Sequence, residues 1–214
     1  MNKNKQWHYW NNKHNSPEYN YTNVSISKPL IEYIDSLSNI NCFLDHGCGH
    51  GRVSKIIYNK FPHAEITIND IVPTAIEKSK QELLNCNLYT VIGRLHHISG
   101  SFDCIISHRV IHSCQNYKDI FREIYRLLSD NGTCFVSGRS INCIQKEINK
   151  DFFDSNNNTI EINHNGRFTK LFNMDEFIDL AKNAGLKIKK SGNFSENAAK
   201  SGKENEYLYI ICSK

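Results

Sequence analysis

Short runs of apolar residues recur along most of the chain and are separated by longer segments of mixed polarity. These runs cover residues 41–45, 64–69, 89–92, 102–107, 133–137, 186–189 and 207–212. Short apolar runs bounded by turn residues are typical of strands buried in a sheet. The pattern therefore predicts seven strands.

The segments between these runs predict helices, because their apolar residues recur at helical spacing. Asn173 is a plausible N-cap and Gly185 a plausible C-cap for the last of them. The alternation predicts an α/β fold, a Rossmann-like, doubly wound and mostly parallel seven-stranded sheet with an antiparallel last strand. The predicted helices cover residues 24–37, 51–60, 73–84, 119–128 and 174–184.

Two segments follow neither pattern. Residues 1–23 are rich in asparagine and aromatic residues and show no clear period. Residues 154–166 are polar and rich in turn-forming residues, so the sequence predicts a mobile loop there.

Composition narrows the class of protein. Hydrophobic residues make up 39% of the 214 residues and charged residues 22%, as in ordinary globular proteins. No apolar run approaches the ~20 residues of a membrane span, and no apolar signal segment follows Met1. We therefore expect a cytoplasmic protein with no membrane partner. The net charge of +4 is too small to indicate a nucleic-acid partner.

The eight cysteines predict neither disulfides nor a zinc site. Cys42, Cys104, Cys134 and Cys212 lie in or beside apolar runs, as small buried residues do. No Cys-x-x-Cys pair occurs, and cytoplasmic thiols are usually reduced. The adjacent His96-His97 has no carboxylate cluster beside it, so we expect no metal.

The turn after the first predicted strand carries the clearest chemistry. It reads Asp45-His46-Gly47-Cys48-Gly49-His50-Gly51 between a strand and a helix, as in nucleotide-binding turns. Glycine is needed where a ligand approaches the backbone more closely than a Cβ permits. Asp70 ends the next strand, where its carboxylate can accept hydrogen bonds from both ribose hydroxyls.

A dinucleotide site is disfavoured by two residues. The dinucleotide fingerprint has glycine at the sixth position of this turn, where the chain has Arg52. Asp45 would place negative charge beside a pyrophosphate, but it suits a ligand with an amino group.

These motifs resemble those of class I S-adenosylmethionine-dependent methyltransferases. The glycine turn is similar to the family's DxGCGxG motif, and Asp70-Ile71 to its acidic second motif. Residues 102–112 resemble its FDxVxxxxVLHH segment, and residues 123–132 its E-x-x-RVLKPGG helix and turn. More weakly, Ser137-Gly138-Arg139-Ser140 and residues 207–214 are similar to small, tellurite-resistance-type methyltransferases.

The resemblance implies that the chain binds S-adenosylmethionine and releases S-adenosylhomocysteine. It implies that the glycine turn wraps the methionine and ribose portions, with Asp45 near the amino group. Asp70 would hold the ribose hydroxyls, and Ile71 would pack on adenine. The expected cofactor-binding residues are Asp45, Gly47, Cys48, Gly49, Gly51, Asp70, Ile71, Leu95 and Ser107.

One position departs from the family. After the third strand the family often has Gly-Asp-Ala/Leu, whose aspartate binds the adenine amino group, whereas this chain reads Gly93-Arg94-Leu95. Arg94 cannot accept that hydrogen bond, but Leu95 can still pack against the ring.

His108, Arg109 and His112 are the candidate catalytic residues. They follow the fourth predicted strand, and the carboxyl ends of strands line the ligand crevice in this fold. A base is needed only if the accepting atom is protonated at neutral pH. His108 is equally compatible with a structural role, and His112 with a position facing the sheet or a capping bond.

Aromatic residues gather near the N-terminus. Trp7, Trp10, Tyr19 and Tyr21 predict a lid that excludes water over the cofactor, although they could instead pack as an ordinary hydrophobic staple on the sheet. Arg139 follows the fifth strand, where it could clamp an anionic substrate group or pair with a surface acid.

Together these features predict a single methyltransferase domain over residues 1–214, with the lid in residues 1–23 and a substrate-side insertion in residues 141–172. The short chain favours a small-molecule acceptor. The alternatives are a nucleic-acid or protein methyltransferase, and a module that binds S-adenosylmethionine without methylating. Amino-methylating nucleic-acid enzymes carry a Pro-Pro motif where this chain reads Ser107-His108-Arg109-Val110, which argues against that alternative. Arg94, in place of the adenine-binding aspartate, is the feature that favours the binding module.

Overall fold

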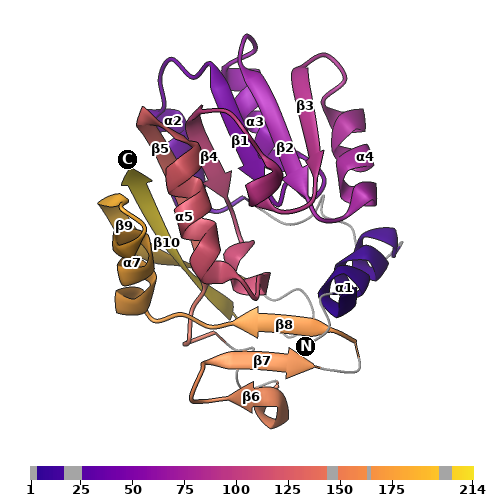
Figure 1. Cartoon of the computed structure of the whole chain (residues 1–214), viewed down its shortest axis with the longest axis vertical. Helices are drawn as coiled ribbons and strands as arrows, with labels where there is room; N and C mark the ends of the chain where they lie inside the picture. The colour runs from indigo at the N-terminus through magenta and orange to yellow at the C-terminus, as the bar shows by residue number, and fades with distance from the viewer. Residues whose placement is uncertain (1–3, 17–25, 144–148, 163–164, 198–203) are drawn as a thin grey trace.

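The protein combines a large sheet, helices on both of its faces, and a second, smaller sheet (Figure 1). The computed structural model describes residues 4–16, 26–143, 149–162, 165–197 and 204–214. Tyr19 and Tyr21 therefore lie outside the described residues. The large sheet contains β1 (Cys42–His46), β2 (Glu65–Asp70), β3 (Asn87–Ile92), β4 (Phe102–Ser107), β5 (Leu128–Arg139), β9 (Lys187–Asn197) and β10 (Glu204–Ser213).

The strand order of the large sheet is β3-β2-β1-β4-β5-β10-β9. Strands β1 to β5 pair in parallel, whereas β10 runs antiparallel to both of its neighbours. The predicted Rossmann-like sheet and its antiparallel last strand are confirmed. The order reverses between β1 and β4, and in open α/β sheets such a switch point opens a ligand crevice at the carboxyl ends of the strands.

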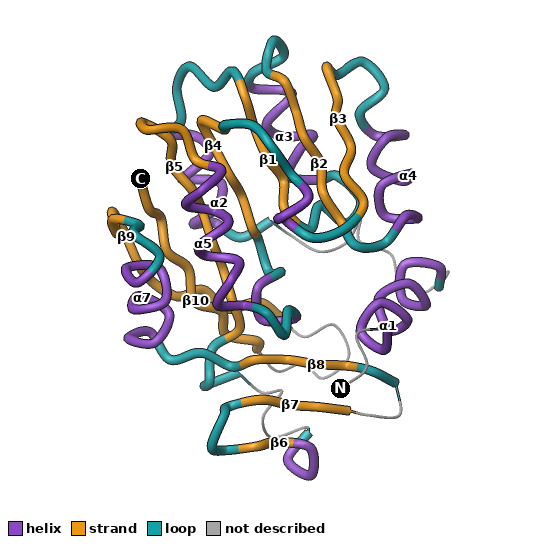
Figure 2. Tube along the Cα trace, in the orientation of Figure 1, coloured by secondary structure: helices purple, strands orange, loops and turns teal. Residues whose placement is uncertain are grey.

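Each face of the large sheet has its own core. Helices α2 (Lys28–Ser36), α3 (Arg52–Lys60) and α4 (Pro73–Glu82) bury Leu30, Ile57 and Ile76 on one face. On the other face, α5 (Tyr117–Leu127) and α7 (Met174–Asn183) cover the sheet (Figures 1 and 2). The side chain of Asn173 accepts a hydrogen bond from the Glu176 N–H at 2.8 Å, which confirms the predicted N-cap of α7.

Strand β5 begins earlier than predicted. Residues 130–132, which resemble the turn that follows the preceding helix in the family, lie inside it, and the β4 register shifts there. A Cβ on Gly132 would lie 2.7 Å from the Phe102 carbonyl oxygen, so glycine is required at this close approach. The turn-forming sequence therefore marks a strand irregularity.

The predicted mobile loop over residues 154–166 is wrong for the described part of that segment. Strands β6 (Phe153–Asp154), β7 (Thr159–Ile162) and β8 (Arg167–Lys170) form an antiparallel sheet. Ile160 and Ile162 point to the same side and pack with Cys143 and Leu171. Two isoleucines make too short an alternation to stand out within a polar segment.

A helix, α1 (Asn4–Asn15), occupies the N-terminal segment for which the sequence showed no period. The indole Nε1 of Trp7 donates to the Ile71 carbonyl at 3.1 Å, and Lys78 Nζ donates to the His14 carbonyl at 2.7 Å. A Cβ on Gly166 would lie 2.2 Å from the Lys5 carbonyl oxygen, so the helix also meets the loop before β8. Hydrogen bonds to Ile71 and α4 hold this helix, which also lies beside β8 (Figure 1). Such contacts explain the missing apolar period.

The eight cysteines are free thiols, as predicted, and Cys104, Cys134 and Cys212 are fully buried. Among the described helices, none is both long enough and apolar enough to cross a membrane.

Candidate active site

A cavity of about 460 Å³ lies at the carboxyl ends of the parallel strands. Its volume falls within the roughly 300–1,000 Å³ of small-molecule sites. Residues of β1, β2 and β5 and of the turn after β4 line it together with residues from α1, β9 and β10. The predicted site residues that line it are Trp10, Asp45, Gly47, Cys48, Gly49, Asp70, Ile71, His108, Arg109, His112 and Arg139.

The glycine turn is fixed to the end of β2. The backbone N–H groups of Gly47 and Cys48 donate to the Asn69 carbonyl at 2.8 and 3.0 Å. Gly47, Gly49 and Gly51 have φ angles of 70°, 55° and 75°, in the left-handed region that favours glycine. A Cβ on Gly47 would lie 2.3 Å from Val110 Cγ2. Glycine is thus needed at this position for packing within the protein as well as for ligand approach.

Asp45, at the end of β1, faces the cavity with one carboxylate oxygen. Its Oδ2 accepts hydrogen bonds from Ser54 Oγ at 2.6 Å and from the Ser54 N–H at 3.2 Å. Its Oδ1 accepts none from the described residues. Burial raises the pKa of the carboxyl to about 6, although the Ser54 bonds oppose the shift. A cationic group would stabilise this buried negative charge.

Asp70 stands across the turn from Asp45. Its Oδ2 accepts from the Gly49 N–H at 3.1 Å, and its Oδ1 from the Val72 N–H at 3.0 Å. Burial raises the pKa of this carboxyl to about 6 as well. Each oxygen keeps a further lone pair for a hydroxyl donor, so the geometry suits the predicted ribose contact.

Three of the predicted cofactor-binding residues do not line the cavity. Leu95 packs in the core beside α5, and Gly51 packs against Ser79. Ser107 is buried, and its Oγ lies 2.9 Å from His46 Nδ1, so it ties β4 to β1. Their contacts with a cofactor stay predictions.

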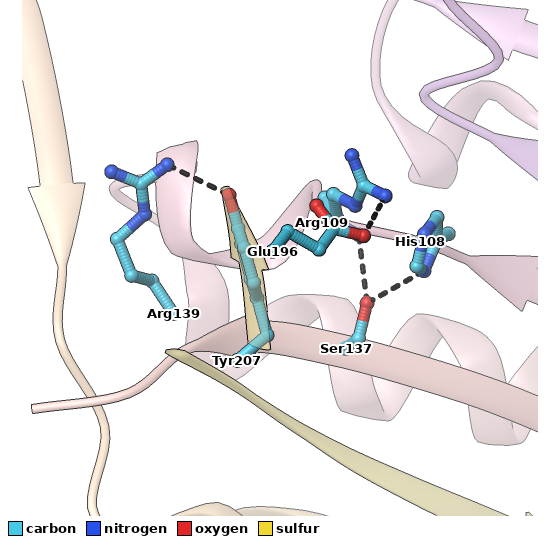
Figure 3. Close-up of polar contacts among 6 residues, drawn as sticks. All are labelled: His108, Arg109, Ser137, Arg139, Glu196 and Tyr207. Atoms are coloured by element: carbon cyan, nitrogen blue, oxygen red, sulfur yellow. Dashed lines mark hydrogen bonds and ion pairs between the residues drawn. The ribbon is translucent and has the colours of Figure 1, made fainter. Parts of the chain in front are cut away.

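His108 is held in an aromatic stack. Its ring lies 5.8 Å from that of Phe194 at an interplanar angle of 25°, and its Nδ1 lies 3.0 Å from Ser137 Oγ (Figure 3). Its Nε2 is buried without a hydrogen-bond partner among the described residues. Burial, with Arg109 and Arg52, holds its pKa well below 6.5. These contacts favour the structural alternative for His108.

Arg109 forms an ion pair with Glu196 of β9 (Figure 3). Its φ of 61° turns the chain sharply after β4, and its N–H donates to Ser137 Oγ at 2.9 Å. Its guanidinium carbon lies 5.6 Å from the Tyr207 ring centre. Arg109 therefore joins the end of β4 to the last two strands.

His112 lines the cavity with a neutral ring. It lies in the turn Ile111–Ser113, 5% exposed, with its ring edge-on to Tyr207 at 5.9 Å. Its Nδ1 has no hydrogen-bond partner in the described part of the chain. Burial, with Arg139, Arg109, Arg167 and Lys13, holds its pKa well below 6.5. An uncharged imidazole beside a cavity can accept a proton.

Arg139 borders the same part of the cavity. Its Nη2 donates to the Tyr207 hydroxyl at 3.0 Å, and its guanidinium carbon lies 5.3 Å from the Tyr207 ring centre (Figure 3). Its Nε is buried without a partner among the described residues. The predicted pairing of Arg139 with a surface acid is not seen there.

Several lining residues that sequence reasoning missed come from distant parts of the chain, among them Lys13, His14, Glu196, Asn205 and Tyr207. His14 Nδ1 lies 3.3 Å from His50 Nε2, so α1 reaches the glycine turn. Burial, with His50 and Lys78, lowers the pKa of His14 to about 4. The aromatic character of residues 1–23 was the only signal for this contact.

Residues 44–136 match the family described as "Methyltransferase domain". The chain is 30% identical over 125 residues to malonyl-[acyl-carrier protein] O-methyltransferase of Bacillus anthracis, a match covering 55% of this chain and 46% of that protein. It is 26% identical over 112 residues to trans-aconitate 2-methyltransferase of Escherichia fergusonii, covering 51% of this chain and 44% of that protein. The matches thus span less than half the length of these curated relatives.

Solved structures share the fold. A SAM-dependent methyltransferase of Methanosarcina mazei superposes with a TM-score of 0.70 at 15% identity, covering 89% of this chain and 99% of that one. TehB from Haemophilus influenzae superposes with a TM-score of 0.65 at 15% identity, covering 94% and 67% of the two chains. At these identities the likeness concerns the fold.

Proposed function

We propose that the protein transfers a methyl group from S-adenosylmethionine to a small-molecule acceptor, because residues 44–136 match the family described as "Methyltransferase domain" and the fold is shared with SAM-dependent methyltransferases. One observation carries the proposal: the cavity that contains the glycine turn, Asp45 and Asp70 also contains His112 and Arg139. A cofactor site and an acceptor site thus share one space. The acceptor named for one relative, trans-aconitate, is a small molecule, which supports this choice.

The residues at the turn fit the cofactor. Asp45 Oδ1 accepts no hydrogen bond from the described residues, so it can accept one from the α-ammonium group. Asp70 offers both oxygens to the ribose hydroxyls, and Ile71 and Cys114 give the cavity an apolar side for adenine. Two buried carboxylates also attract the positive charge of a sulfonium.

The protein positions the cofactor and the acceptor, and it accepts a proton from the acceptor. When bound, S-adenosylmethionine would supply an electrophilic methyl group on sulfur and would be released as S-adenosylhomocysteine. In-line positioning can contribute about 7–11 kcal/mol. His112, which is neutral near pH 7, takes the proton of an acceptor that is protonated in solution.

The helix α1 serves as the lid in this proposal. Trp7 donates to the carbonyl of Ile71, beside the proposed adenine position, while Trp10 lines the cavity. His14 contacts His50 of the glycine turn. A helix held by such polar contacts can open to admit the cofactor and then exclude water.

Calorimetric titration with S-adenosylhomocysteine tests the proposal. We expect micromolar binding by the wild-type protein and at least tenfold weaker binding by Asp70→Asn, about 1.4 kcal/mol. Asp119→Asn is the matched control, since Asp119 is exposed on α5 and pairs only with Arg122 among the described residues. Absence of binding, or binding indifferent to Asp70, overturns the proposal.

Methyl-transfer assays distinguish the proposed function from the two alternative functions. Transfer of labelled methyl groups to tRNA, DNA or protein, and not to small molecules, would assign the chain to nucleic-acid or protein methylation. Binding of S-adenosylmethionine with no transfer to any of these would make it a binding module.

A further inference from the structure

Positively charged side chains gather at the part of the cavity that the cofactor residues do not occupy. Lys13 of α1 and Arg139 of β5 line the cavity there, next to His112 and Tyr207. Arg167 of β8 lies close enough that its charge lowers the pKa of both Lys13 and His112. Three elements that are far apart in the sequence thus bring their cations to one place.

Arg139 lacks a carboxylate partner within the described residues. Its one hydrogen bond there goes to the neutral phenol of Tyr207, and its Nε is buried and unsatisfied. Glu196, the acid that lines this part of the cavity, already forms an ion pair with Arg109. Leaving a buried guanidinium N–H without an acceptor is unfavourable. Such a group in a cavity indicates a missing acceptor on a ligand.

Lys13 lies in the electrostatic field of the neighbouring cations. Burial, with Arg167 and Arg139, lowers its pKa from 10.5 to about 8. Its Nζ lies 5.0 Å from the Trp10 ring centre and 5.7 Å from that of Tyr9, so aromatic faces support it. An anion placed among these cations would stabilise all of them.

We propose that the methyl acceptor is an organic anion whose carboxylate binds to Arg139, with Lys13 of α1 completing the contact. This inference rests on the proposed function and names the substrate class of the same cavity. A carboxylate matches the planar pairs of guanidinium N–H donors. Because it is held by the cations, this carboxylate anchors the acceptor, and another atom of the molecule, facing His112, receives the methyl group.

Helix α1 gains a second role from this arrangement. Lys13 is the residue that links the acceptor to the helix that also contacts the glycine turn through His14. Binding of an anionic acceptor would therefore hold α1 closed over both ligands. Acceptors without the anion would lack this effect as well as the Arg139 contact.

Fractionated metabolites test the inference. A bacterial small-molecule extract, freed of macromolecules, is separated into anionic, neutral and cationic fractions, and each is incubated with the protein and methyl-labelled S-adenosylmethionine. We expect labelled product from the anionic fraction, surviving prior phosphatase treatment. Loss after phosphatase would identify a phosphate as the anchor and overturn the carboxylate assignment. Product from the neutral or cationic fraction only, or from none, overturns the proposal.

Three variants at Arg139 and Lys13 test whether these residues bind the acceptor. Arg139→Gln should raise KM for the active fraction at least tenfold, Arg139→Lys should raise it less, and Lys13→Gln should raise it by about threefold. S-adenosylhomocysteine affinity should stay within about twofold in all three, which shows that the proteins are folded. An unchanged KM in Arg139→Gln overturns the proposal. Failure of the wild-type protein to bind S-adenosylhomocysteine would instead overturn the proposed function, so the two failures are distinguishable.

Discussion

Ser54 donates two hydrogen bonds to one and the same oxygen of Asp45, from its Oγ at 2.6 Å and from its backbone N–H at 3.2 Å. The first turn of α3 thereby fixes the carboxylate and turns its other oxygen towards the cavity. The two bonds do not offset the burial of the charge, because the pKa of Asp45 is still raised to about 6. The site keeps a charge that the empty protein would be more stable without, as expected of a group that serves a cationic ligand.

Asp45→Asn should raise the stability of the protein and weaken its binding of S-adenosylmethionine. The folded-state pKa of about 6 lies above the ordinary 3.8, so the contribution of this group to stability is greatest at low pH and is lost as pH rises through 6. Asparagine keeps an oxygen for Ser54 and removes the buried charge. At about pH 8 we expect a gain of about 1–2 kcal/mol in the free energy of unfolding, with at least tenfold weaker S-adenosylmethionine binding. Urea denaturation and calorimetry measure both, and loss of stability with unchanged affinity would contradict the assignment.

Cofactor binding should weaken in acid. Asp45 and Asp70 both have pKa values raised to about 6 by burial, and both must be ionised to hold an ammonium group and to accept from hydroxyls. S-adenosylhomocysteine affinity should be constant above about pH 7 and fall by up to tenfold for each group per pH unit below 6. Titrations across this range in Asp70→Asn should show a shallower fall. A flat profile in the wild-type protein would mean that neither carboxylate contacts the ligand.

His112→Gln should affect chemistry more than binding. An amide cannot accept the acceptor's proton as imidazole does, so kcat should fall by roughly 10²–10⁴, while S-adenosylhomocysteine affinity stays within about twofold. His108→Phe is the control, because a phenyl ring keeps the stack on Phe194 and loses only the contact with Ser137. Equal losses of kcat in both variants would remove His112 from the role of base.

The sequence predicted the part of the site that lies at the ends of the first strands. Asp45 and Asp70 each end a strand whose apolar run is visible, and parallel strands bring their carboxyl ends together. Tyr207 and Glu196 could not be found this way, because they reach the cavity through the pairing of β10 with β5 and β9. Nothing in the residues around Tyr207 indicates that Arg139 will be its partner.

Local patterns also failed where tertiary contacts decide the structure. Helix α1 has no continuous apolar face, since hydrogen bonds to Ile71 and to Lys78 of α4 hold it in place. The β6–β8 sheet arises from two isoleucines, Ile160 and Ile162, that find a small separate core. In both places the stabilising contacts come from residues more than a few positions away, which periodicity does not record.

Trp7→Phe should accelerate release of the cofactor. The variant keeps an aromatic ring on α1 but loses the indole N–H that donates to the Ile71 carbonyl at 3.1 Å. A hydrogen bond of about 1 kcal/mol corresponds to a roughly fivefold faster dissociation of S-adenosylhomocysteine, measured by stopped-flow displacement. Tyr58→Phe, which removes a hydrogen bond to the Asn85 carbonyl away from the cavity, is the control. An unchanged dissociation rate in Trp7→Phe would separate α1 from the lid role.

Gly47 and Val110 should show coupled effects on stability. A Cβ at Gly47 would meet Val110 Cγ2 at 2.3 Å and Cγ1 at 2.8 Å, on a backbone whose φ is 70°. Gly47→Ala should therefore cost about 2–4 kcal/mol of unfolding free energy, from overpacking and from the left-handed conformation.

Val110→Ala removes both methyl groups that the new Cβ would meet, so it should recover the overpacking part of that loss. We expect a coupling energy of about 1 kcal/mol or more in the double-mutant cycle, measured by urea denaturation of the four proteins. The left-handed part should remain in the double variant. If the two changes are additive, then the glycine is required by its φ angle and by ligand approach, and Val110 only borders the turn.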